Sequence, residues 1–180
     1  SVWTVKLAAP RERMPGLQLG IQARLDRVVA QMSTWEPDSS LSRFNAAPAG
    51  HRQMLEEEFA TVLAYALALA RDTDGAYDPT IGPLVNLWGF GPDGPRTVPD
   101  EEAIAAARAR VGWQRLDFDA ATRTLEQPGG VYLDLSSIAT GFGVDEVARY
   151  LESEGVHDYL IELGGELRAA GRRPDGQPWR

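Results

Sequence analysis

The chain has 180 residues, 43% of them hydrophobic, and contains no cysteine. This length supports one sizeable core, so a single compact body is expected. The missing cysteines exclude disulfides, thiolate nucleophiles and zinc–thiolate sites. The net charge of −8 and the pI near 4.8 argue against nucleic-acid partners and anionic membranes, because both require clusters of Lys and Arg.

Metal and membrane signals are also weak in the composition. The two histidines, His51 and His157, are far apart in the sequence, so a His-rich metal centre is excluded. No apolar run reaches the roughly 18 residues of a membrane span. The first residues show no basic-then-apolar signal pattern, and the export history of the protein is therefore not readable from them.

The first two elements are a strand and a helix. Alternating β-formers predict a strand over residues 2–7, and Pro10, Pro15 and Gly16 follow it as breakers. From Leu17 to Met32 the apolar residues recur at helical spacing. This pattern predicts a long helix packed on a sheet.

Residues 33–45 (STWEPDSSLSRFN) are dense in turn formers and predict a loop with aromatic anchors. The indole of Trp35 at its start can lie against a planar ligand ring. Alternatively, Trp35 and Phe44 only pin the loop to the core. A helix should follow from the acidic patch at residues 56–58 to about Thr73, since negative charge favours the first helical turn.

Residues 74–91 (DGAYDPTIGPLVNLWGFG) combine glycines with large apolar side chains. Asp74 and Gly75 should stop the preceding helix, and Pro79 favours an exposed, extended backbone over residues 76–78 that can meet a ligand. Residues 82–91 are expected to form a short helix and a buried turn. This segment walls a pocket, or it is a hydrophobic plug that joins two lobes.

Asp100 should cap a short helix that runs to Ala109. Three short strands are then predicted at 116–118, 124–126 and 131–133, with a Gly129–Gly130 turn before the last. Further on, residues 159–163 and 166–170 should form an antiparallel pair around Gly164 and Gly165. Residues 178–180 resemble the start of another strand.

The segment from Val131 to Leu151 combines a strand, a turn and a helix. Asp134 interrupts an apolar strand, residues 136–143 predict a small-residue turn, and an amphipathic helix follows from Val144. The first N–H groups of a helix favour an anion such as a phosphate. An adjacent carboxylate suits a ribose hydroxyl, an amide N–H or a divalent cation. The segment therefore suggests a nucleotide site, with an ordinary helix cap as the alternative.

Four motifs in this order resemble those of the ApbE family of flavin transferases, the FAD:protein FMN transferases. The resemblance covers essentially the whole chain. It implies an α+β fold with a mostly antiparallel sheet packed with helices, a T-fold-like architecture that is truncated at the C-terminus. Residues 1–180 would be the N-terminal portion of the domain. The motifs are STWEPDSSLSRFN at 33–45, DGAYDPTIGPLVNLWGFG at 74–91, LDLSSIATGFGVDEVARYL at 133–151 and LIELGGELRAAG at 160–171.

The resemblance implies magnesium-dependent transfer of FMN from FAD to a Thr or Ser hydroxyl of an acceptor protein, with release of AMP. The expected acceptor is a respiratory flavoprotein subunit, and the expected location is the periplasm or cell envelope. Two alternatives stay open: a non-catalytic flavin carrier for the maturation of a respiratory enzyme, and an FAD pyrophosphatase. No nucleic-acid partner is expected.

The resemblance also implies site residues. Ser137 matches a position whose main-chain oxygen binds Mg²⁺, a hard ion that prefers oxygen ligands. Thr140 departs from the family, where many members have Lys, and brings no charge to the pyrophosphate. The expected FAD contacts are Trp35, Ala76, Tyr77, Asp78, Asp134 and Thr140.

No catalytic residue is assigned within the chain. The family's motif with His, Asp-Pro and Thr-Gly, and its later metal ligands, do not occur in residues 1–180. The chain alone is therefore expected to bind flavin weakly and to be inactive without a complementary C-terminal fragment or chain.

Overall fold

The computed structural model describes residues 2–94 and 98–180. The chain divides into two compact units. The first unit comprises residues 1–28 and 137–180, and the second comprises residues 29–136. Each unit contains a three-stranded antiparallel sheet together with helices, so the α+β prediction is confirmed.

The sheet of the first unit has the order β1-β5-β6. Its strands are β1 (Trp3–Leu7), β5 (Tyr159–Leu163) and β6 (Glu166–Ala170), and all three were predicted from the sequence. Trp3 pairs with Leu163 and Leu7 with Tyr159. Because side chains alternate across a strand, Tyr159, Ile161 and Leu163 share one face, and all three are buried.

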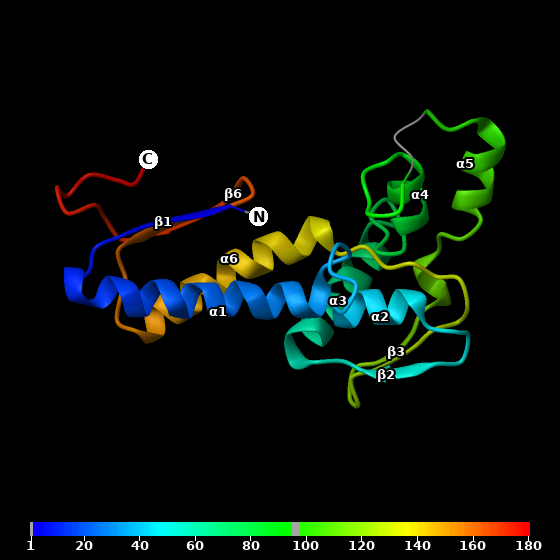
Figure 1. Cartoon of the computed structure of the whole chain (residues 1–180), viewed down its shortest axis with the longest axis horizontal. Helices are drawn as coiled ribbons and strands as arrows, with labels where there is room; N and C mark the ends of the chain where they lie inside the picture. The colour runs from blue at the N-terminus through cyan, green and yellow to red at the C-terminus, as the bar shows by residue number, and fades with distance from the viewer. Residues whose placement is uncertain (1, 95–97) are drawn as a thin grey trace. The chain divides into compact units, whose positions relative to one another are not determined.

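Two long helices cover this sheet, α1 (Met14–Met32) and α6 (Ser136–Ser153). A short 3₁₀ turn, η1 (Arg11–Arg13), precedes α1. Within the first unit, β1 and β6 lie on one side of the two helices (Figure 1). The core formed between them consists of Leu17, Ile21, Leu25, Val144, Val147, Ala148, Leu151, Val156, Tyr159, Ile161 and Leu163.

The second unit is mostly helical, with a small sheet of order β2-β4-β3. Its strands have three residues each, and its largest buried side chains include Phe44, Phe59 and Leu125. In chain order its elements are α2 (Ser40–Ala46), β2 (Arg52–Met54), α3 (Glu57–Asp72), α4 (Gly82–Leu87), α5 (Glu101–Arg108), η2 (Trp113–Arg115), β3 (Asp117–Asp119) and β4 (Thr124–Glu126).

Most predicted boundaries in this unit hold. Helix α3 ends where Asp74 and Gly75 take positive φ angles of 49° and 80°, and the Asp100 carboxylate caps α5 by accepting from Ala103 N at 2.8 Å. Gly129 and Gly130 also take positive φ angles, as a tight turn requires. Strand β2 was not predicted from the sequence, although the equally short strands β3 and β4 were.

Five expectations were wrong. Residues 33–45 are not all loop, because Ser39 caps α2 through a bond from Ser42 N to Ser39 Oγ (2.9 Å). Residues 131–133 form no β-ladder, and residues 136–143 are the first two turns of α6 instead of a separate turn. The turn after α4 is exposed instead of buried, and residues 178–180 form no strand. No described helix combines the length and the apolar character that crossing a bilayer requires.

Candidate functional site

Residues 33–45 carry two aromatic side chains with different roles, Trp35 in the loop before α2 and Phe44 within α2. Ser33 Oγ accepts from Trp35 N at 3.1 Å and from Glu36 N at 3.3 Å, which fixes the start of the loop. Phe44 is completely buried, whereas 61% of Trp35 is exposed. Phe44 therefore anchors the loop, and the indole of Trp35 is left on the surface where a planar ring can stack on it.

Ala76 and Tyr77 form bends, Asp78 has no regular structure, and none of the three has a strand partner. The N–H of Ala76 donates to Thr73 O at 3.1 Å, and the N–H of Tyr77 donates to Thr73 Oγ1 at 3.1 Å. The expectation of an extended backbone open to a ligand is therefore wrong for these two donors. The last turn of α3 already uses both of them.

Asp78 has an internal role in this structure. Its Oδ1 accepts from Thr80 N (2.8 Å) and Thr80 Oγ1 (2.6 Å), and its Oδ2 accepts from Trp113 N (3.1 Å). Thr80 is fully buried and accepts in turn from Gly112 N at 2.7 Å. The Asp78 side chain thus ties residues 78–80 to residues 112–113, and sequence reasoning missed Thr80 as its partner.

Asp134 lies in a segment without regular secondary structure that runs from Val131 to Leu135; Val131, Leu133 and Leu135 are buried, and Asp134 is half-buried. Its backbone N–H donates to Pro79 O at 2.8 Å, so Asp134 and the Asp78 segment are adjacent. Its carboxylate Oδ1 accepts from Ser136 N at 2.9 Å and from Ser136 Oγ. No described residue donates to Oδ2, which leaves one carboxylate oxygen for a ligand hydroxyl or amide.

The start of α6 differs from the sequence expectation. The helix begins at Ser136, and the Asp134 carboxylate already binds the N–H of Ser136. The negative charge of Asp134 therefore occupies the helix N-terminus that was expected to receive a phosphate. Ser137 and Thr140 lie in the first two turns of α6 and belong to the first unit, whereas the other predicted site residues belong to the second.

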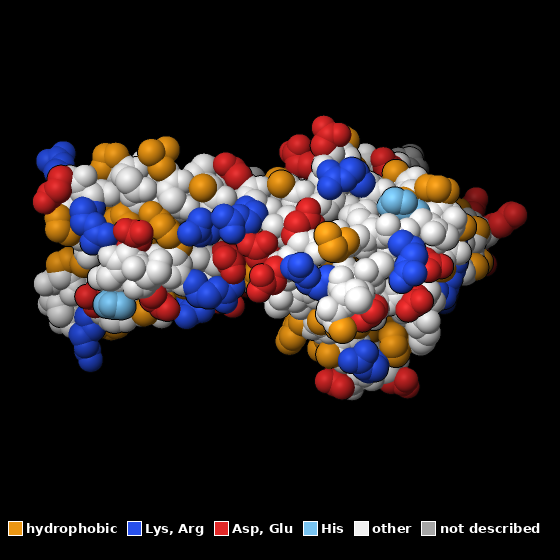
Figure 2. Space-filling model, turned by 90° about the horizontal axis from the view of Figure 1, so that it is seen from below, with side chains coloured by type: hydrophobic (Ala, Val, Ile, Leu, Met, Phe, Trp, Pro, Cys, Tyr) orange, Lys and Arg blue, Asp and Glu red, His pale blue; other side chains and the backbone are white. Residues whose placement is uncertain are grey.

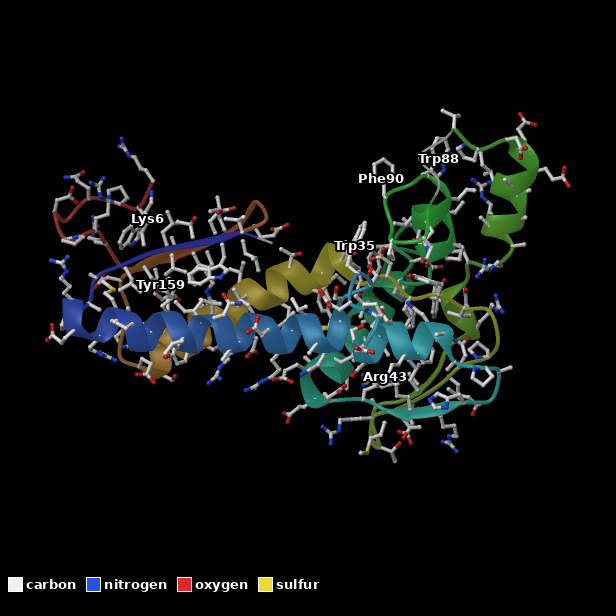
Figure 3. All side chains as sticks on the ribbon, in the orientation of Figure 1. Lys6, Trp35, Arg43, Trp88, Phe90 and Tyr159 are labelled. Carbon is white, nitrogen blue, oxygen red and sulfur yellow. The ribbon has the colours of Figure 1, made fainter. Side chains whose placement is uncertain are left out.

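Two more aromatic residues lie at the C-terminal end of α4. Trp88 and Phe90 are both exposed, Phe90 by 77%. In the view of Figure 3 they lie on the same side of the second unit as Trp35, with Arg43 on the opposite side. The predicted hydrophobic plug is therefore wrong for these two side chains, which face solvent.

A complete metal site is not formed by the residues described. Nowhere in 2–94 and 98–180 do three or more His, Asp or Glu side chains gather as they would around an ion. The Ser137 carbonyl lies in the first turn of a helix, where such groups point along the helix axis. The expected contact from Ser137 is this one carbonyl oxygen, and Mg²⁺ takes six ligands, so the described residues alone do not fit a closed Mg²⁺ site.

No basic cradle is visible on the face drawn in Figure 2. On the face seen in Figure 2, acidic and basic side chains are interspersed over both units. Near Asp134, burial raises the pKa of Tyr132 above its usual value of 10. Tyr132 is therefore a neutral phenol at physiological pH and adds no charge to this part of the second unit.

The backbone around Asp134 is held by side chains that sequence reasoning did not single out. The carboxamide of Asn45 bonds both the N–H and the C=O of Leu133. Gln127, fully buried, does the same for Val131. Asn45 ends one of the motifs noted above, but its side-chain target, 88 residues away, has no local sequence signal.

Comparison with known proteins places these features in a family. The model of the ApbE family matches residues 1–180. A relative from Vibrio cholerae, named FAD:protein FMN transferase, is 46% identical over 165 residues, which cover 91% of this chain and 49% of the relative. A relative of the same name from Haemophilus influenzae is 46% identical over 166 residues, covering 89% of this chain and 48% of the relative.

Two solved structures are also similar to this chain. The structure named flavin transferase ApbE from Vibrio cholerae superposes with a TM-score of 0.92 at 42% identity, covering 99% of this chain and 58% of that one. The apo form of a flavinyl transferase ApbE from Pseudomonas stutzeri gives a TM-score of 0.90 at 42% identity, covering 100% and 60%. The chain thus spans about half the length of the curated relatives it matches. This chain belongs to the ApbE family.

Proposed function

We propose that this chain provides the flavin-binding part of an FAD:protein FMN transferase. The observation that carries the proposal is the 46% identity to relatives of that name. Two features of the second unit support it. The exposed indole of Trp35 offers a stacking surface for a flavin or adenine ring, and Oδ2 of Asp134 offers an acceptor for a ligand hydroxyl or amide.

The proposed roles follow the chemistry of each group. Trp35 stacks on a ring, Asp134 accepts a hydrogen bond, and the segment Ala76–Asp78 lies along the cofactor, with Asp78 shaping that segment from within. Thr140 donates a hydroxyl hydrogen bond where a charged side chain is common in the family. Without that charge, this chain should bind the pyrophosphate less tightly than a relative with Lys.

In the proposed reaction, the hydroxyl oxygen of an acceptor Thr or Ser attacks the phosphorus of the FMN half. The bond from that phosphorus to the bridging oxygen breaks, AMP leaves with the bridging oxygen, and the hydroxyl proton is lost to a base. Bound Mg²⁺ would neutralise charge that develops on the phosphate oxygens. Ser137 is the one residue of this chain proposed to contact it, through its main-chain oxygen.

The proposed partner is a respiratory flavoprotein subunit with an accessible Thr or Ser. The proposed location is the periplasm or cell envelope, for which the family resemblance is the support. The alternatives predict other products. An FAD pyrophosphatase would use water in place of the hydroxyl and release FMN and AMP, and a carrier would return FAD unchanged.

A two-stage experiment tests the proposal. FAD is first titrated into the chain by isothermal titration calorimetry, with and without Mg²⁺, and saturable binding is expected. A Thr-containing acceptor peptide is then added, and mass spectrometry should show a gain of one FMN together with AMP in solution. Because the relatives are about twice as long as the matched region, the second stage is run with and without a complementary C-terminal chain.

The outcomes separate the hypotheses. Absence of FAD binding under both metal conditions would rule out the proposed function. FMN and AMP released without acceptor modification would establish the pyrophosphatase instead. Binding with no turnover in either arrangement would favour the carrier.

A further inference from the structure

The segment that carries Asp134 is built without a neighbouring strand. Residues 131–135 have no regular secondary structure but alternate in burial as an extended chain does, with Val131, Leu133 and Leu135 almost completely buried, and no β-ladder includes them. Buried backbone N–H and C=O groups must nevertheless find partners, because leaving them unpaired is costly. The partners determine where this segment lies.

Asn45 supplies the central pair of these bonds. Its Nδ2 donates to Leu133 O at 2.9 Å, and its Oδ1 accepts from Leu133 N at 2.8 Å. A carboxamide has the same donor and acceptor as a peptide group. Asn45 therefore pairs with Leu133 as one residue of an adjacent strand would. The two bonds fix the position of the Leu133 backbone.

The flanking bonds are made by other parts of the second unit. Gln127 pairs with Val131 through bonds of 3.1 and 3.3 Å, and Pro79 O accepts from Asp134 N at 2.8 Å. Among these three contacts, Asn45 and Pro79 act on Asp134 or its immediate neighbour. Gln127 acts two residues further away, in the same turn as Gly129.

Asn45 also belongs to the element that follows Trp35. It lies in the last turn of α2, whose first turn is capped by Ser39 directly after the Trp35 loop. Since successive side chains alternate in an extended segment, holding the Leu133 backbone orients the Asp134 carboxylate towards the opposite face. Asn45 thus connects α2, the helix that follows Trp35 in the sequence, to the segment that carries the Asp134 carboxylate.

We propose that Asn45 is a positioning residue for flavin binding, which acts by holding the Asp134 carboxylate in place. The inference rests on the proposed function, because it requires Asp134 to contact FAD. Asn45 does not itself touch the ligand in this account. Its contribution to FAD affinity is made through Asp134.

A double-mutant cycle tests this dependence. FAD dissociation constants are measured by calorimetry for the wild-type chain, Asn45→Ala, Asp134→Ala and the double variant, at a temperature where circular dichroism shows all four folded. Asn45→Ala and Asp134→Ala should each weaken binding by about tenfold. The double variant should be no weaker than Asp134→Ala alone, because residues that act as a unit are not additive.

A matched control separates positioning from general destabilisation. Gln53 also uses a side-chain amide to bond a backbone carbonyl in the second unit, that of Ser40 at 2.9 Å. Gln53→Ala should lower the melting temperature and leave FAD affinity unchanged. If Asn45→Ala does not fold, Asn45→Asp replaces it: that side chain keeps the acceptor for Leu133 N, but it places a charged oxygen against Leu133 O in place of the donor.

The failure modes are distinct. A wild-type chain that binds no FAD would refute the proposed function itself. If the wild type binds and the effects of the two substitutions multiply to about a hundredfold in the double variant, Asn45 acts independently of Asp134 and the inference is wrong. Unchanged affinity in folded Asn45→Ala would also overturn it.

Discussion

At the scale of single residues, exposure and hydrogen bonding divide the predicted site into two kinds of group. Trp35 presents its indole to solvent, and Asp134 accepts hydrogen bonds from Ser136 through Oδ1 alone among the described residues. Asp78 uses both carboxylate oxygens inside the protein, on Thr80 and Trp113. A sequence motif marks both kinds equally, because it records which residues are needed and not whether they contact a ligand or hold the fold.

Trp35→Ala should weaken FAD binding by at least about fivefold and by up to about 150-fold, since stacking on an aromatic ring contributes roughly 1–3 kcal/mol per base. The melting temperature should change little because the indole is largely exposed. Calorimetric titration with FAD measures the first effect and thermal unfolding the second. Tyr65, equally exposed at 61% and located on α3, is the control: Tyr65→Ala should keep wild-type affinity, and an equal loss there would contradict a specific role for Trp35.

Tyr132 should make stability depend on alkaline pH. Burial raises its pKa in the folded state above the usual value of 10, so its contribution to stability is fully present below pH 10 and is lost as pH rises through the higher folded value. Tyr132→Phe should reduce this loss of stability at alkaline pH. The measurement is the free energy of unfolding at pH values from about 8 to about 11, a range that includes the usual tyrosine pKa of about 10. The pKa of Tyr159 is also raised by burial. The single variant should therefore still lose some stability at alkaline pH, and Tyr132→Phe/Tyr159→Phe should lose less than the single variant. An unaltered pH profile in the double variant would refute this assignment.

At the scale of elements, segments with a clear period were predicted, as were the short strands β3 and β4, whereas β2 and the segments at 33–45, 131–133 and 136–143 were not. The strands at 159–163 and 166–170 and the helices α1 and α3 show their period over many residues. The extended segment at 131–135 shows strand-like alternation of burial, but its partners are the side chains of Asn45 and Gln127. Alternation predicts which face is buried and does not specify what bonds the backbone.

Helix α6 offers a matched pair of glycines for a stability test. A Cβ added at Gly141 would meet nothing within 4 Å, whereas one at Gly143 would lie 3.2 Å from Leu163 Cδ2 and 3.5 Å from Leu25 Cδ2. Gly141→Ala should therefore stabilise the protein by about 0.5–1 kcal/mol, the usual difference in helix propensity. Gly143→Ala should gain less or lose stability, because the packed leucines must move. Urea unfolding measures both, and a larger gain at Gly143 than at Gly141 would show that the packing around Gly143 is looser than the structure indicates.

At the scale of the whole molecule, charge should govern how FAD approaches. The chain carries a net charge of −8, and FAD is an anion, so the two repel each other at long range. Repulsion is screened as the Debye length falls from about 30 Å at 0.01 M salt to about 8 Å at 0.15 M.

The association rate of FAD, measured by stopped-flow fluorescence without divalent ions, should therefore rise with NaCl over this range. Riboflavin, which has no phosphate, is the control, and its association rate should be insensitive to salt. A rate for FAD that falls with salt would indicate a local basic site that overrides the net charge.

The sequence by itself determined the family, the elements with a clear period and the residue types expected at the site, because local chemistry and spacing are written directly in the chain. Tertiary structure decided which oxygen of Asp134 is open, that Phe44 is buried while Trp35 is exposed, and that Asn45 replaces a missing strand beside Leu133. Those outcomes depend on pairs such as Asn45 and Leu133, 88 residues apart, and a bond over that separation has no period, cap or turn signal from which it can be predicted.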